Sequence, residues 1–309
     1  MLDQAKRAAR AALEAWRRAA SASHVRQSRP HVTRAALNAG LARLGIAPGD
    51  TLFVHSSLKS LGYVEGGAPA VIGALQDAVG PQGTLLLPTY YLPGGTVRAT
   101  CAMPDYVFDP RRHGTHMGRL PEAFLASAGV RRSIHPTHSV SAWGRHAIHL
   151  TEAHQRAPSI FGMDSPWQRF IGCEHAKVLG LGISMGPVTF YHALEDAMGG
   201  AFPVPVWEDD TKLLPCLDHA GRRWDVPVRP FDQAVAQRRI DHPGRGDLRD
   251  YFHREFDTAG LRVNGQVGDA ASWCIPAQAF YAHLERLASD NVTIYASAAQ
   301  LAARPIGRA

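Results

Sequence analysis

The sequence predicts an α/β protein with a central, mostly parallel sheet flanked by helices, together with a smaller β-rich subdomain. Residues 51–88 follow the order strand, loop, helix and strand, which is the pattern of a βαβ unit. A further short apolar run at residues 177–182 predicts a third buried strand. After residue 203, short apolar pieces alternate with Asp, Gly and Pro, which is typical of antiparallel strands.

The sequence predicts two helices and two strands between residues 33 and 88. Thr33 is the expected N-cap of a helix that ends at Gly45. Residues 51–55 are expected to form a strand, residues 68–79 a helix and residues 83–88 a second strand. This order requires a parallel sheet, because the two strands are joined by a helical crossover.

A long segment without periodicity separates these elements from the third strand. Residues 92–118 contain Gly, Pro, Asp and Arg in no regular order, and we expect a functional loop there. A helix is expected to start near Thr189, and two strands are expected at residues 213–217 and 223–228. The predicted parts of the chain are a basic helical extension at residues 1–31, a main α/β domain at residues 32–202 and 266–309, and a smaller β-rich subdomain at residues 203–265.

Most of the net charge of +6 belongs to the N-terminal extension, where residues 1–31 hold seven basic and two acidic residues. Residues 3–20 predict a helix with Ala and Leu on one side and Lys and Arg on the other. A solvated helix is the first interpretation, and contact with a partner or with acidic lipid is the alternative. Because nucleic-acid binding requires a basic face on the folded body, no nucleic acid is expected as a partner.

The composition places the chain among ordinary globular proteins, with 45% hydrophobic and 19% charged residues. No stretch approaches the roughly 20 apolar residues of a membrane span, and the N-terminus has no apolar signal-peptide core. These features predict a cytoplasmic protein without a membrane span. The cysteines are widely spaced and are expected to be small buried residues rather than disulfides or zinc ligands; they are Cys101, Cys173, Cys216 and Cys274.

The segment from Thr189 to Glu195 has the sharpest catalytic pattern in the chain. His192 and Glu195 are three residues apart, so they share one face of a helix. A carboxylate beside an imidazole fixes its tautomer and raises its basicity, as a general base requires. Thr189, one turn earlier, is placed to stabilise a developing oxyanion. Taken alone, the pattern is more often an ordinary surface pair.

A second candidate site is the loop that begins at Ser56, which follows a strand and leads toward Gly66 and Gly67 at the start of a helix. Such loops expose backbone N–H groups that can hold phosphate or an amide. A plain strand-to-helix turn explains the residues equally well. The loop matches neither a P-loop nor a dinucleotide-binding fingerprint, so nucleotide hydrolysis and NAD chemistry have no support.

Two histidine pairs have the spacing of metal ligands, His113 with His116 and His135 with His138. No cysteine or carboxylate cluster completes either set, and Pro136 interrupts any helix that would bring the second pair together. We therefore expect no metal. A serine hydrolase is also not supported, since no Gly-x-Ser-x-Gly elbow is present.

Several separate stretches, found in the family's order over about residues 32–285, resemble the aminoglycoside 3-N-acetyltransferase family, the antibiotic N-acetyltransferases that differ from the GNAT fold. They are residues 49–62, 83–89, 117–122, 132–144, 165–166 and 265–270, together with Thr189, His192 and Glu195.

The resemblance implies an antibiotic N-acetyltransferase-like fold and direct transfer of an acetyl group from acetyl-CoA to an amine. His192 corresponds to the general base, Glu195 to the carboxylate that orients it, and Thr189 to a position beside the thioester. The α/β domain would bind CoA, and the β-rich subdomain would lie on the acceptor side. The residues that correspond to the CoA channel are Ser56, Ser57, Leu58, Gly66, Gly67, Met117, Gly118 and Arg119.

The acceptor is less closely defined, because the sequence departs from the family in the basic extension, in residues 109–118 and in the stretch after Glu195. We expect a small amine of an aminoglycoside or amino-sugar-like compound. Alternatives are another acyl-thioester donor, a non-aminoglycoside amine, or a non-catalytic binding module. The sequence is compatible with drug resistance and with a homodimer. Four carboxylates are candidates for contacting a cationic acceptor, with plain solvation as the alternative: Asp196, Glu208, Asp209 and Asp210.

Overall fold

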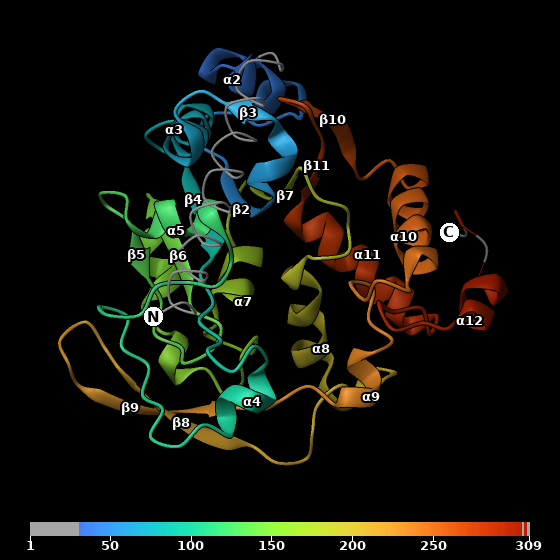
Figure 1. Cartoon of the computed structure of the whole chain (residues 1–309). Coiled ribbons are helices and arrows are strands. Elements are labelled where there is room, and N and C mark those ends of the chain that lie inside the picture. The colour runs from blue at the N-terminus through green and yellow to red at the C-terminus, as the bar shows by residue number, and fades with distance from the viewer. Residues whose placement is uncertain (1–30, 305, 308–309) are drawn as a thin grey trace, which may run out of the picture.

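The computed structural model describes residues 31–304 and 306–307 of the 309-residue chain (Figure 1). The helix expected at residues 3–20, like the extension up to residue 30, lies outside the described residues. The elements, in order, are β1 (His31–Val32), α2 (Arg34–Arg43), β2 (Thr51–Ser56), β3 (Tyr63–Val64), α3 (Gly67–Val79), β4 (Thr84–Pro88), α4 (Val97–Cys101), α5 (Arg119–Leu125), β5 (Arg131–Arg132), β6 (Val140–Gly144), α6 (Ala147–Thr151), α7 (Pro166–Ile171), β7 (Ala176–Leu181), α8 (His192–Met198), β8 (Lys212–Leu217), β9 (Arg223–Val228), α9 (Gln233–Ala236), α10 (Gly246–Thr258), β10 (Val263–Val267), β11 (Ala270–Pro276), α11 (Ala277–Ser289) and α12 (Ala298–Ala303).

Seven strands form one sheet in the order β10-β11-β7-β2-β4-β6-β5. The strand β2 lies in the centre and pairs in parallel with β7 on one side and with β4 on the other. These are the three strands that the sequence predicts, and the α/β class is confirmed. The outer pairings are antiparallel, so the parallel part of the sheet is its centre.

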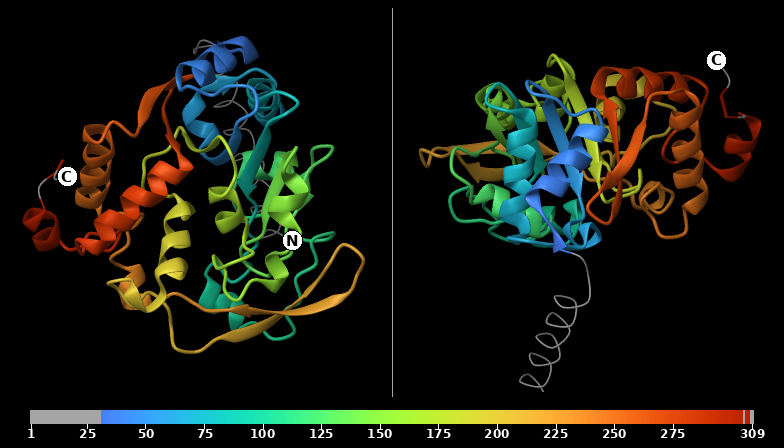
Figure 2. Two further views of the ribbon diagram at one scale, coloured as in Figure 1. Left: turned by 180° about the vertical axis from the view of Figure 1, so that it is seen from behind. Right: turned by 90° about the horizontal axis from the view of Figure 1, so that it is seen from above.

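Both faces of the central strands are buried. Phe53 and Val178 belong to one apolar cluster, whereas their neighbours Leu52 and Leu179 belong to another on the opposite face. This alternation follows from the two-residue period of a strand, and burial on both faces explains the continuous apolar runs. The helices α2, α3 and α5 contribute side chains to the second cluster, while α7, α8, α10 and α11 contribute to the first; Figures 1 and 2 show the two groups on different sides of the sheet.

The sequence-based boundaries agree closely with the structure in the first half of the chain. Thr33 caps α2, and its side chain accepts a hydrogen bond from the backbone N–H of Ala36 at 3.2 Å. The strands β2, β4 and β7 each begin or end within one residue of the predicted limits. The loop predicted at residues 92–118 contains one short helix, α4, whose five residues are too few to show a period.

The segment 203–265 differs from the expected β-rich subdomain. It contains the predicted hairpin of β8 and β9, which forms its own two-stranded sheet and projects from the body of the protein (Figure 2). It also contains α9, α10 and the first residues of β10, which joins the large sheet. The two expected strands and their small separate sheet are confirmed, and the helix α10 is an addition that the sequence-based prediction did not include. The division into domains remains a prediction.

Three of the four cysteines are buried as expected, and Cys101 is partly exposed. Among the described residues, no helix combines the length and the apolar character that crossing a bilayer requires.

Six histidines are buried among the described residues, and four of them have a pKa that burial lowers strongly. Burial lowers the pKa of His55 and of His154 to about 3, and lowers the pKa of His135 and His138 as well. His154 is held as a neutral ring between the Ser133 hydroxyl and the Ile160 carbonyl, both at 3.0 Å. His135 stacks on it with 4.4 Å between ring centroids. These rings are therefore part of the packing as uncharged groups.

We predict that the protein loses stability as the pH falls below about 6.5, because the unfolded chain binds protons at these histidines and the folded chain does not. The stabilising contribution is complete above pH 6.5 and is lost progressively toward pH 3, at about 1.4 kcal/mol per pH unit for each fully buried histidine. Urea denaturation at several pH values between 7 and 5 measures the slope of the free energy of unfolding against pH. In this range the carboxylates with lowered pKa values remain ionised. His55→Leu should reduce the slope, and the exposed His149→Gln should not. A slope of zero in the wild type would contradict the prediction.

Candidate active site

The sheet positions the candidate catalytic segment at the carboxyl end of β7, where ligands bind in parallel α/β sheets. Several hydrogen bonds hold the loop that follows. The Ser57 N–H donates to the Leu181 carbonyl at 2.9 Å, and the Gly182 N–H donates to the Ser272 hydroxyl at 3.0 Å. The Trp273 indole donates to the Ile183 carbonyl at 2.9 Å. The start of α8 is therefore fixed relative to β2, β7 and β11.

Gly180 makes this arrangement possible. It pairs with Trp273 across β7 and β11, and a Cβ atom at position 180 would lie only 2.1 Å from the Trp273 indole. The absence of a side chain lets the indole lie flat against β7 and reach the Ile183 carbonyl.

His192 and Glu195 are brought together as the sequence predicts. The His192 Nδ1–H donates to Glu195 Oε2 at 2.8 Å, and both side chains are buried, with Glu195 only 2% exposed. The other carboxylate oxygen, Oε1, accepts a hydrogen bond from the Tyr295 hydroxyl at 2.8 Å. The Nε2 atom of His192 makes no hydrogen bond within the described part of the chain, which leaves its lone pair available.

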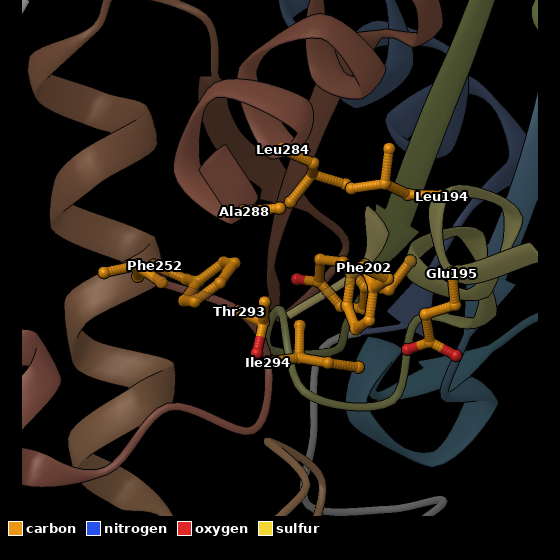
Figure 3. A pocket seen from close by; sticks show the side chains of 10 residues that line it. Leu194, Glu195, Phe202, Phe252, Leu284, Ala288, Thr293 and Ile294 are labelled. Carbon is orange, nitrogen blue, oxygen red and sulfur yellow. The ribbon is translucent and has the colours of Figure 1, made fainter. Parts of the chain in front are cut away.

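The space behind Glu195 is apolar (Figure 3). Leu194, Phe202 and Ile294 surround it, and the remaining gap measures about 10 Å³, which corresponds to a single water at most. The carboxylate therefore depends on His192 and Tyr295 for its hydrogen bonds. Because a buried carboxylate without partners is strongly unfavourable, these contacts fix the imidazole in one tautomer and one orientation.

Aromatic rings line the other sides of His192. The Phe161 and Phe231 rings lie 5.1 Å and 4.8 Å from the imidazole, centroid to centroid. The Trp207 ring in turn stacks on Phe231 at 4.4 Å. This arrangement excludes bulk water from the imidazole and leaves a confined approach to Nε2.

Thr189 lies in a 3₁₀ turn that leads directly into α8, so the helical segment starts at the predicted residue. Its hydroxyl is 2.7 Å from the Tyr90 hydroxyl, and the Tyr90 ring lies 4.5 Å from the His138 ring. The side chain is partly exposed and does not contact His192 by a hydrogen bond. Thr189 therefore lies in the turn before His192, and its hydroxyl is directed at Tyr90, which follows β4.

The residues that the resemblance assigns to CoA occupy three chain turns. Ser56 ends β2, and Ser57 and Leu58 lead into a 3₁₀ turn. Gly66 and Gly67 form the N-terminal end of α3, both with positive φ, and Met117–Arg119 forms that of α5. Gly67 and Gly118 have open space where a Cβ would be. The helices α3 and α5, which follow the last two turns, pack against each other.

The histidine pairs with metal-ligand spacing have other roles. His113 and His116 both stack on Tyr91, with centroids 4.5 Å and 4.8 Å away. His135 accepts backbone hydrogen bonds from Thr137 and His138. Among residues 31–304, no group of three or more potential ligands is placed to hold a metal ion.

Three contributors to the site escape sequence reasoning. Tyr295 is 100 residues from Glu195, and no spacing rule connects them. Tyr90 and Phe231 come from segments whose local pattern is that of a strand end and a loop. The only signal near them is their aromatic character, which is shared by many core residues.

Comparison with known proteins agrees with this geometry. A family model described as Aminoglycoside 3-N-acetyltransferase matches residues 53–289. The chain is 39% identical over 259 residues to aminoglycoside N(3)-acetyltransferase III of Acinetobacter baumannii, covering 80% of this chain and 87% of the relative.

Solved structures show the same architecture. The crystal structure of aminoglycoside acetyltransferase AAC(3)-Xa superposes with a TM-score of 0.71 at 31% identity, covering 86% of this chain and 95% of the other. A second structure, described as AAC-IIIb binary with CoASH, superposes with a TM-score of 0.66 at 28% identity, covering 82% and 94%. The antibiotic N-acetyltransferase-like fold is thus confirmed.

We predict that Tyr295→Phe lowers the free energy of unfolding by about 1–3 kcal/mol, because Glu195 Oε1 then has no donor in a buried site. Chemical denaturation measures the difference. The matched control is Tyr281→Phe, since the Tyr281 hydroxyl is only partly buried and makes no hydrogen bond among the described residues. Equal stability of both variants would show that the hydrogen bond to Glu195 contributes little.

Proposed function

The chain belongs to the aminoglycoside 3-N-acetyltransferase family, and on this premise we propose that it transfers the acetyl group of acetyl-CoA to an amine of an aminoglycoside or amino-sugar-like acceptor, with His192 as general base. The observation that carries the proposal is the buried chain of hydrogen bonds from Tyr295 through Glu195 to His192. It leaves one imidazole nitrogen free inside a ring of aromatic side chains. An ordinary surface pair would be solvated instead.

The chemistry follows from the state of the acceptor. A protonated amine has no lone pair and cannot attack a thioester until it loses a proton. His192 Nε2 accepts that proton, and the new N–C bond forms as the C–S bond breaks. The imidazolium then gives a proton to the departing thiolate of CoA, and the remaining excess proton on the new amide nitrogen passes to solvent. Glu195 stabilises the imidazolium that arises, since its carboxylate already accepts the Nδ1–H. No acyl-enzyme is required.

We assign Thr189 to the thioester, because its hydroxyl lies in the turn before His192 and is partly exposed. The turns at Ser56–Leu58, Gly66–Gly67 and Met117–Arg119 are proposed to hold CoA through backbone N–H groups, which suit phosphate and amide oxygens. Ser60 and Gly182, close to the first of these turns, line a cavity of about 630 Å³. A solved structure with this architecture is described as a binary complex with CoASH, which supports CoA as the ligand.

An enzyme that consumes acetyl-CoA works where this metabolite is available, which supports the expectation of a cytoplasmic protein. Acetylation of an aminoglycoside drug would confer resistance, whereas acetylation of another amino sugar would not.

We predict that His192→Asn lowers kcat/KM for acetyl transfer by about two to four orders of magnitude, because the step loses its base. Acetyl-CoA binding should change little, since the proposed CoA turns are formed by other residues. Release of free CoA thiol measures turnover, and titration of acetyl-CoA by calorimetry measures binding. The control is His149→Asn, an exposed histidine outside the site.

Wild-type turnover in His192→Asn would remove His192 from the mechanism. Thiol release that is independent of any amine would favour the alternative of an acyltransferase with a different acyl-thioester donor.

A further inference from the structure

The Tyr90 hydroxyl makes one hydrogen bond among the described residues, to the Thr189 hydroxyl at 2.7 Å. The two residues come from separate elements, since Tyr90 follows β4 and Thr189 begins the 3₁₀ turn that leads into α8. The Thr189 hydroxyl has no second partner in the part of the chain that the structure describes. Each hydroxyl carries one proton, so this pair uses one proton internally and leaves the other free for a ligand.

The burial of the two side chains decides which proton is free. Tyr90 is only 3% exposed, whereas Thr189 is partly exposed. If Thr189 were the donor, the Tyr90 proton would remain without an acceptor in the core, which is unfavourable. A phenol is also more acidic than an aliphatic alcohol and is the stronger donor, and burial raises the pKa of Tyr90, so the phenol retains its proton. Tyr90 therefore donates to Thr189 Oγ1, and the Thr189 proton is the free one.

The phenol of Tyr90 is held in place through its backbone and its ring. The Tyr90 carbonyl accepts a hydrogen bond from the His116 N–H at 2.9 Å. The rings of His138 and Trp167 lie 4.5 Å and 6.2 Å from the Tyr90 ring, centroid to centroid. Because the phenol has a fixed position, the Thr189 hydroxyl that accepts its proton is held in one orientation.

Resting on the proposed function, which assigns Thr189 to the thioester, we propose that Tyr90 is a positioning residue that directs the Thr189 proton at the thioester carbonyl oxygen. Negative charge develops on this oxygen as the amine attacks, and the hydrogen bond from Thr189 then strengthens. No proton is transferred in this contact, and the hydrogen bond weakens again once the amide carbonyl has formed. The hydrogen bond from Tyr90 also makes Thr189 a stronger donor, because hydrogen bonds in a chain polarise one another.

The test is CoA thiol release with gentamicin, a polycationic aminoglycoside, as acceptor. Tyr90→Phe removes the hydroxyl and keeps the packed ring. We expect this variant to lower kcat by about ten-fold and to leave the KM for acetyl-CoA unchanged, because the hydroxyl orients a contact that strengthens only during the reaction. Thr189→Val removes the donor itself and should lower kcat by about a hundred-fold, whereas Thr189→Ser should retain most of the activity.

The double variant of Tyr90→Phe and Thr189→Val separates positioning from a general structural effect. Because Tyr90 acts only through Thr189, the double variant should be no slower than Thr189→Val alone. The control is Tyr106→Phe, which removes another buried hydroxyl, one that donates to the Pro136 carbonyl at 2.6 Å. This control should lose stability to a similar degree and leave kcat unchanged.

A wild-type kcat in either Tyr90→Phe or Thr189→Val would overturn the inference and preserve the proposed function. A double variant whose loss equals the product of the two single losses would overturn it as well, since Tyr90 would then act independently of Thr189. If the wild type releases no thiol with gentamicin or with glucosamine, the proposed function fails, and the inference fails with it.

Discussion

The Glu195 carboxylate lies between the His192 imidazole and the Tyr295 hydroxyl, and each of its oxygens accepts a hydrogen bond of 2.8 Å. Because the carboxylate is buried, the loss of either donor would leave a charged oxygen without compensation. The start of α8 and the segment after α11 must therefore keep a fixed relative position. This constraint orients the His192 imidazole as a base, which the His-x-x-Glu spacing alone does not do.

The sheet supplies the rigidity that this arrangement requires. The parallel strands β2 and β7 end together, and the hydrogen bonds of Ser57, Gly182 and Trp273 tie the following loop to them. A cavity that Phe231 shares is lined instead by the loop before α4, by α4 itself and by the segment around α9, which are short elements outside the sheet.

The parts predictable from the sequence are those set by local periodicity. The central strands are buried on both faces, so they appear as apolar runs, and the pair His192 and Glu195 follows from the turn of a helix. The strand β10 and the four-residue helix α9 are too weakly patterned to be recognised, whereas α10 was missed although its apolar residues Leu248, Tyr251, Phe252 and Phe256 recur at helical spacing. Tyr295 and Phe231 reach the site only through tertiary packing. No pattern of spacing can identify contacts between segments so far apart.

The position of the proton on the His192 ring tests this account most directly. Nitrogen-15 NMR of protein with labelled histidine, assigned by comparison with His192→Asn, reports which ring nitrogen carries the proton in the neutral imidazole. The structure predicts a proton on Nδ1, donated to Glu195, and an unprotonated Nε2 facing the acceptor. A proton on Nε2 in the resting enzyme would contradict the account, because His192 would then have no lone pair directed at the amine.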